Sequence, residues 1–250
     1  MVRSFGRVAV AMAEAEYRPA GPEGGSEEPV EAEVARRTEA LRAALARSEA
    51  LLQDLDHRAK NNLQALTSLA VLKARRVKDG AARGALTNMA ERIGAISTAH
   101  RLVQPDGDAT WFDLRDLVGD VSRDLVEAIK PAGVDVAFDL APLALAGDKA
   151  APLALLVSEL VGNALRHAFP DGGGRLVVSA DADGDLRIVV ADDGPGLAAH
   201  GSSEESFGKT LIAMLARQLR GEIAWEDAAP GTRVVVVIPL DDGDRKASGR

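Results

Sequence analysis

The sequence predicts an α+β protein in two parts, a helical hairpin followed by an α/β sandwich. Residues 31–78 contain neither proline nor glycine, and leucines and small residues recur there at three- and four-residue spacing. After a break at residues 104–108, the pattern changes to short alternating strands separated by amphipathic helices. Strands joined mostly as hairpins, with helices gathered on one side, are typical of an α+β sandwich.

The hairpin is predicted to consist of one helix from Glu31 to about Lys78 and a second from about Ala81 to Val103. Asp79 and Gly80 end the first helix. One hairpin leaves half of its apolar seam uncovered, so we expect residues 31–104 to pair in a homodimer that forms a four-helix bundle. The seam residues are Leu41, Leu45, Leu52, Leu55 and Leu66 on the first helix and Leu86, Met89, Ile93, Ile96 and Val103 on the second.

The second part is predicted to cover residues 110–240, and its elements follow from the periodicity of its apolar residues. We expect helices at 111–130, 151–169 and about 207–219, and strands at 134–140, 175–180, 186–191, 221–226 and 233–238. The two ends, residues 1–30 and 241–250, are predicted to be disordered tails, the first of them because it is polar and rich in proline, glycine and glutamate.

Composition excludes several classes of function. The net charge of −8, the pI near 5.1 and the aromatic fraction of 3% argue against nucleic acid as a partner. There is no cysteine, which excludes disulfides and thiolate chemistry and fits a reducing compartment, so the cytoplasm is the default expectation. No apolar run reaches the roughly 20 residues of a membrane span. Partners are expected to be proteins or small ligands.

His57 is the first candidate site residue, because it stands on the polar face of the long helix. It lies two residues after Leu55, about 200° around a helix, and Lys60, Asn61 and Gln64 follow on its own face. Asp56 precedes it. Such an imidazole is a candidate phosphoryl acceptor, although a solvated surface histidine would give the same pattern.

The second part holds a polar helix face and an acidic turn. Glu159, Asn163 and Arg166 fall on one face of the helix at 151–169, with His167 four residues after Asn163; a solvated helix face would look the same. Asp192, Gly194 and Gly196 follow a buried-type strand in a turn where backbone can approach a ligand, or in an ordinary tight turn.

Two further segments complete the pattern. Gly208, Lys209 and Thr210 begin a helix, whose free backbone amides suit phosphate. Gly231 and Thr232 immediately precede the last strand. A P-loop is excluded, since Ser203 stands where its first glycine is required.

Taken in order, these segments resemble known families. The run from Asp56 to Gln64 resembles the phosphoacceptor box of sensor histidine kinases, in the subgroup where histidine is followed by Arg, a small residue, Lys, two Asn, Leu and Gln. The later segments resemble the N, G1 and G2 boxes of the Bergerat-fold ATPase domain, which histidine kinases share with Hsp90, type II topoisomerases and MutL-type proteins. The resemblance covers about residues 45–240. Gly208 departs from it as a lone glycine in its box, and Trp225 does not match the tryptophan of the related HWE kinases.

The resemblance implies a role for each site residue, with ATP and Mg²⁺ as cofactors. Asn163 would hold Mg²⁺, Glu159 would act as base or polariser, and Asp56 would assist His57. The remaining residues would bind the nucleotide: Arg166 and His167 at phosphate, Asp192 at the adenine amino group, Gly194 and Gly196 in shaping the pocket, Gly208, Lys209 and Thr210 over the phosphates, and Thr232 in the wall.

The implied function is that of a two-component histidine kinase. It would phosphorylate His57 with ATP and pass the phosphoryl group to an aspartate of a response-regulator receiver domain. Input would come from a separate sensor protein or through the acidic tail. The alternative is a phosphotransfer or phosphatase module whose ATPase domain no longer turns over ATP, whereas a chaperone-like or mismatch-repair ATPase leaves the His57 segment unexplained.

Overall fold

The computed structural model describes residues 30–107, 109–130, 132–170, 172–196 and 203–245, with backbone only for residues 31, 49, 52, 53, 56 and 203–207. The chain divides into two compact units, the first ending at Asp54 and the second beginning at Leu55. Apart from Val30, the predicted N-terminal tail lies outside the described residues. Among the described residues, no helix combines the length and apolar composition needed to cross a bilayer.

Helix α2 (Val30–Arg76) supplies all of the first unit that is described and continues into the second. Its first turns are held by polar pairs at helical spacing, in which Arg37 donates to Glu33 at 2.6 Å and Arg36 donates to the same carboxylate at 3.1 Å. Leu41 and Leu45 remain 70% and 61% exposed. In the described part of the first unit, this segment therefore presents exposed apolar side chains.

Helix α3 (Gly80–Leu102) follows a three-residue turn, close to the predicted boundary. Asp79 caps it, because its carboxylate accepts a hydrogen bond from Ala82 N at 3.0 Å. The buried face of α3 is made of small residues, namely Ala90, Ala95, Thr98 and Ala99. Small side chains let α3 approach its neighbours closely.

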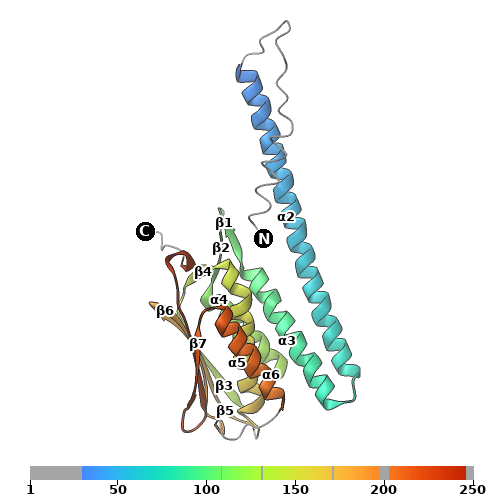
Figure 1. Ribbon diagram of the computed structural model, residues 1–250. Helices are drawn as coiled ribbons and strands as arrows, with labels where there is room; N and C mark the ends of the chain where they lie inside the picture. Colours follow the sequence, from blue (N-terminus) through green and yellow to red (C-terminus); the bar gives the residue numbers. More distant parts are fainter. Residues whose placement is uncertain (1–29, 108, 131, 171, 197–202, 246–250) are drawn as a thin grey trace. The chain divides into compact units, whose positions relative to one another are not determined.

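The sandwich is built on a five-stranded sheet of order β3-β5-β6-β8-β7, in which only β3 and β5 are parallel. Its strands are β3 (Val134–Leu140), β5 (Gly174–Asp183), β6 (Asp185–Asp192), β7 (Glu222–Asp227) and β8 (Thr232–Ile238). Helices α4 (Leu114–Ile129), α5 (Ala150–His167) and α6 (Ser203–Gln218) gather on one side of this sheet (Figure 1). The predicted α+β class is confirmed.

The core lies between these helices and the sheet. Leu117, Leu153, Leu156, Ile188 and Val236 are fully buried there. Each such side chain contributes about 1.5–3 kcal/mol on leaving water. The packing of α5 on the sheet therefore fixes the positions of the residues at the edge of the sandwich.

Three local predictions were wrong. Residues 104–106 form strand β1 and Ala109–Asp113 form β2, which pair with each other, and β2 also pairs with β4 (Ala144–Ala146). The predicted helix therefore begins at Leu114 rather than Trp111, because Asp113 caps it by accepting from Arg115 N at 2.7 Å. The predicted C-terminal tail begins later than 241, since Asp242–Asp244 form a 3₁₀ helix and Asp244 pairs with Lys149 at 3.1 Å.

Candidate functional site

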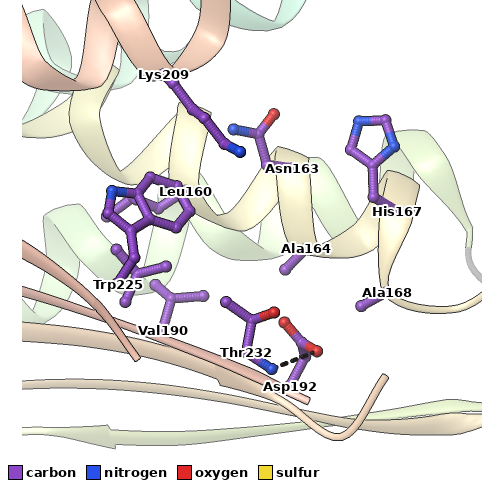
Figure 2. A pocket seen from close by; sticks show the side chains of 11 residues that line it. Leu160, Asn163, Ala164, His167, Ala168, Val190, Asp192, Lys209, Trp225 and Thr232 are labelled. Atoms are coloured by element: carbon purple, nitrogen blue, oxygen red, sulfur yellow. Dashed lines mark hydrogen bonds between the residues drawn. The ribbon is translucent and has the colours of Figure 1, made fainter. Parts of the chain in front are cut away.

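A small cavity opens at the edge of the sandwich where α5 faces the sheet (Figure 2). Its volume is about 50 Å³, below the roughly 300–1,000 Å³ of most ligand pockets. Five residues predicted from the sequence meet there: Asn163, His167, Asp192, Lys209 and Thr232. The other lining residues are Leu160, Ala164, Ala168, Val190, Trp225 and Val234.

Asp192 stands at the end of β6 with one carboxylate oxygen fixed by backbone. Its Oδ1 accepts hydrogen bonds from Gly194 N at 3.0 Å and Thr232 N at 3.1 Å, and Figure 2 shows the second of these. Both of these hydrogen bonds from the described backbone reach Oδ1, which leaves Oδ2 placed to accept a hydrogen bond from a ligand. The turn thus presents an oriented acceptor in an otherwise apolar wall.

Two glycines allow this turn to close. A Cβ on Gly231, whose φ is +99°, would overlap the Asp192 carbonyl oxygen, and a Cβ on Gly194 would overlap the carbonyl oxygen of Ala168. Gly196 is buried with φ +80°, a conformation that favours glycine. The glycines of the predicted motif are therefore required by backbone packing around Asp192.

Asn163 and His167 project from α5 toward the same cavity, one helical turn apart (Figure 2). Helix α6 begins at Ser203, so Gly208, Lys209 and Thr210 lie in its second turn, and the prediction that they begin the helix was wrong. Gly208 packs directly on Asn163: it is buried, and a Cβ on it would lie 3.4 Å from Asn163 Nδ2. A larger residue at 208 would press on the amide. The lone glycine of this segment thus lets α6 pass close to Asn163.

Lys209 and Trp225 narrow the cavity. The Lys209 Nζ lies 5.6 Å from the centroid of the Trp225 ring, within the range of a cation–π contact. The sequence did not predict Trp225 as a site residue, because this tryptophan follows the α6 segment and does not match the tryptophan of the HWE kinases. Its position on β7, beside β8, brings it to the cavity.

Glu159 and Arg166 lie on the same helix but are not among the residues that line this cavity. Glu159 is 4% exposed and accepts two hydrogen bonds from Arg92 of α3, at 2.5 Å from Nε and 3.1 Å from Nη2. Arg166 donates to Glu91 at 2.6 Å. The two partners on α3 were not predicted from the sequence.

Thr210 is exposed and is not among the cavity-lining residues. His57 is exposed on α2, as are Lys60, Asn61 and Gln64. The seam residues Leu55 and Leu66 are exposed as well, so the outward face of this helix stays a prediction. The side chain of Asp56 lies outside what the structure describes. His57 is not among the residues that line the cavity either, so any reaction between the two requires them to approach each other.

Within the described ranges, no cluster of three or more His, Asp or Glu side chains gathers as a protein-only metal site would need. Asn163 could offer a single amide oxygen to a cation. Such a site fits Mg²⁺, which keeps several waters and often binds through one or two protein ligands together with substrate phosphates.

Two family models match the chain. The model described as histidine kinase matches residues 54–129, which include His57. The model described as histidine kinase-, DNA gyrase B- and HSP90-like ATPase matches residues 148–242, which include every residue of the cavity. Together the two segments cover more than half of the chain.

The chain is also similar to individual kinases. It is 30% identical over 217 residues to the sensor histidine kinase PdtaS of Mycobacterium tuberculosis, covering 83% of this chain and 42% of that protein. It is 25% identical over 198 residues to the blue-light-activated histidine kinase 2 of Erythrobacter litoralis, covering 76% and 57%. The chain thus spans about half the length of the curated relatives it matches.

A solved structure supports the fold. The histidine kinase domain of the Erythrobacter litoralis blue-light activated histidine kinase superposes with a TM-score of 0.55 at 22% identity, covering 71% of this chain and 96% of that domain. With a histidine kinase segment followed by an HSP90-like ATPase segment, the chain belongs to the sensor histidine kinase family.

Proposed function

We propose that this chain is an ATP-dependent protein-histidine kinase of two-component signalling. It phosphorylates His57 and passes the phosphoryl group to an aspartate of a response-regulator receiver domain. The observation that carries the proposal is the Asp192 carboxylate, held through Oδ1 by two backbone amides at an apolar cavity that Asn163, His167 and Lys209 also line. An oriented acceptor in an apolar slot suits a flat base with an amino group, and the nearby polar groups suit its phosphates.

In this proposal Asp192 Oδ2 accepts a hydrogen bond from the adenine amino group, and Thr232 stands beside it. His167 and Lys209 contact the phosphates, and Gly208 leaves room for them beside Asn163. Mg²⁺, when bound, neutralises charge on the β- and γ-phosphates. Asn163 would hold that ion.

The chemical step is an in-line transfer. A neutral ring nitrogen of His57 attacks the γ-phosphorus, a P–N bond forms, and the bond from the γ-phosphorus to the bridging oxygen breaks, so that ADP leaves. The proton on the other ring nitrogen passes to Asp56 or to water, which leaves a neutral imidazole ring that carries the anionic phosphoryl group. In the second step the receiver carboxylate attacks the same phosphorus, and the imidazole leaves.

The proposal is tested by incubating the pure protein with γ-labelled ATP and Mg²⁺. We expect a label that is stable in alkali and lost in acid, as a phosphoramidate is, and that moves to a receiver domain when one is added. If the protein binds nucleotide yet never becomes labelled, the phosphotransfer alternative replaces the kinase.

Dimerisation through the hairpin gives a second prediction. In the second unit, Leu55, Leu66 and Leu69 are 61%, 51% and 54% exposed along α2, and we expect a second copy to cover them. Light scattering should give the mass of a dimer at micromolar concentration. Leu55→Glu should weaken the dimer roughly 10–100-fold, because it places a charge in the apolar contact.

Gln64→Glu is the matched control, because it adds the same charge on the exposed polar face of α2. It should leave the dimer intact. A wild-type protein that is monomeric at this concentration would refute the bundle.

Trp225 provides a third prediction, because a base that enters the cavity must displace Lys209 from its ring. Nucleotide binding should change the intrinsic fluorescence, and Trp225→Phe should abolish that change while weakening affinity only a few-fold. The chain has one other tryptophan, Trp111, which lies in β2. A signal that disappears in Trp111→Phe and persists in Trp225→Phe would place the base elsewhere.

A further inference from the structure

Helices α3 and α5 are joined by a cluster of four charged residues, namely Glu91, Arg92, Glu159 and Arg166. Arg92 binds both oxygens of Glu159, at 2.5 and 3.1 Å. The preceding residue, Glu91, accepts from Arg166 at 2.6 Å. Two adjacent residues of α3 thus bind two residues of α5 that lie on one face of that helix. Arg92 binds Glu159, and Glu91 binds Arg166.

The cluster is partly removed from water. The side chains of Glu159 and Glu91 are 5% and 9% exposed, and those of Arg92 and Arg166 are 24% and 25% exposed. Ion pairs with this burial and a two-point Arg–carboxylate geometry are strong and directional, and breaking one costs more than breaking a surface pair. The cluster thus supplies directional contacts between α3 and α5, in addition to the packing of the small buried residues of α3.

The residues held on α5 are two of those assigned to catalysis and phosphate contact by resemblance. Glu159 lies beside Gly208 of α6, since a Cβ on Gly208 would be 3.6 Å from Glu159 Oε2 and 3.4 Å from Asn163 Nδ2. While Arg92 occupies the Glu159 carboxylate, that carboxylate is not available to His57. While Glu91 occupies Arg166, it takes the place that a phosphate would take on this guanidinium.

There is space for α3 to move. A cavity of about 790 Å³ flanks the cluster, lined by residues of α2, α3, α4 and α5 that include Gly94, Val121, Leu125 and Arg166. The buried residues of α3 are small, namely Ala90, Ala95, Thr98 and Ala99, so few bulky side chains oppose a shift. Toward α4 the helix is also held by hydrogen bonds from Thr98 to Asp124 and from Arg101 to Asp120, whereas toward α5 the ion pairs of the cluster supply the directional contact.

We propose that this cluster is an autoinhibitory contact: α3 keeps Glu159 and Arg166 engaged in the resting kinase, and a movement of the helical hairpin releases them for ATP and His57. The proposal rests on the proposed kinase function and adds to it the residues that regulate it. Glu91 acts as an internal competitor of the triphosphate for Arg166. Arg92 acts on the reaction only through Glu159.

The test uses Glu91→Gln and Arg92→Gln in the full chain, which keep side-chain size and remove the charge. Binding of a fluorescent ATP analogue and the initial rate of His57 labelling are measured for each. We expect Glu91→Gln to bind the analogue about 3–10-fold more tightly, since Arg166 loses its competing anion. Arg92→Gln should raise the labelling rate by a similar factor, with a smaller change in affinity.

Arg101→Gln is the matched control. Arg101 also joins α3 to the sandwich, through Asp120 of α4 at 3.0 Å, but neither residue is among those that line the nucleotide cavity. It should keep wild-type affinity and rate. Weaker or unchanged binding and labelling in both cluster variants, or an equal gain in Arg101→Gln, would overturn the proposal.

A readout without nucleotide separates this proposal from the kinase assignment. Glu91→Arg places like charges together, so hydrogen exchange of α3 should quicken, and the double variant Glu91→Arg/Arg166→Glu should restore protection. Failure of the double variant to restore it would remove the cluster as the holding contact. Wild type that shows this exchange pattern but is never labelled would refute the kinase assignment alone.

Discussion

His57→Ala should remove the phosphoryl label completely, a loss of at least about 1,000-fold in initial rate. The imidazole is the proposed nucleophile, and alanine offers no group that can form a P–N bond. His57 is exposed on α2, so its removal takes away no core packing. The measurement is the rate of acid-labile label formation from γ-labelled ATP.

His100→Ala is the control, because His100 is a second exposed histidine, on α3. It should be labelled as fast as wild type. Nucleotide affinity should also be unchanged in His57→Ala, since His57 does not line the cavity. A label that persists in His57→Ala would show that another residue accepts the phosphoryl group.

The elements of the sandwich that sequence periodicity placed well are those whose own side chains alternate between core and surface. Strand β5 is an example: Leu176, Val178 and Ala180 are buried, and Val177 and Ser179 between them are only partly buried. The short strands β1, β2 and β4 carry no such pattern, because three to five residues are too few to show a period. Their pairing depends on residues far apart in the chain, so Trp111 was placed in a helix.

The same distinction explains which site residues could be predicted. Asp192, Gly194 and Gly196 lie within one turn, and Asn163 and His167 lie one helical turn apart, so local spacing brings each group together. Trp225 reaches the cavity only through the pairing of β7 with β8.

Local spacing could not predict the roles of Glu91 and Arg92, because both bind residues that are distant in the sequence. Arg92 meets Glu159 across 67 residues of sequence, and Glu91 meets Arg166 across 75. Helical spacing predicted that Glu159 and Arg166 share one face of α5. The residues that bind them, Arg92 and Glu91, depend on how α3 packs against α5, and no local pattern specifies that packing.

Asp192→Asn should weaken nucleotide affinity by roughly 100-fold or more, although it changes only one atom of the side chain. Its remaining carbonyl oxygen can still accept from Gly194 N and Thr232 N, so the turn keeps its shape. The new amide NH₂ then takes the place of Oδ2 and directs donors at the adenine amino group, which is itself a donor. Titration with a fluorescent ATP analogue measures the loss, and circular dichroism should be unchanged.

Asp193→Asn is the matched control for this loss. Asp193 is the adjacent carboxylate, is exposed, and accepts from Arg175 N at 2.7 Å, a bond that asparagine can also accept. It carries the same change of charge at nearly the same place but does not line the cavity. Its affinity should therefore match wild type. An equal loss in both variants would mean that general electrostatics, and not the direction of one hydrogen bond, governs binding, whereas full affinity in Asp192→Asn would remove Asp192 from the base site.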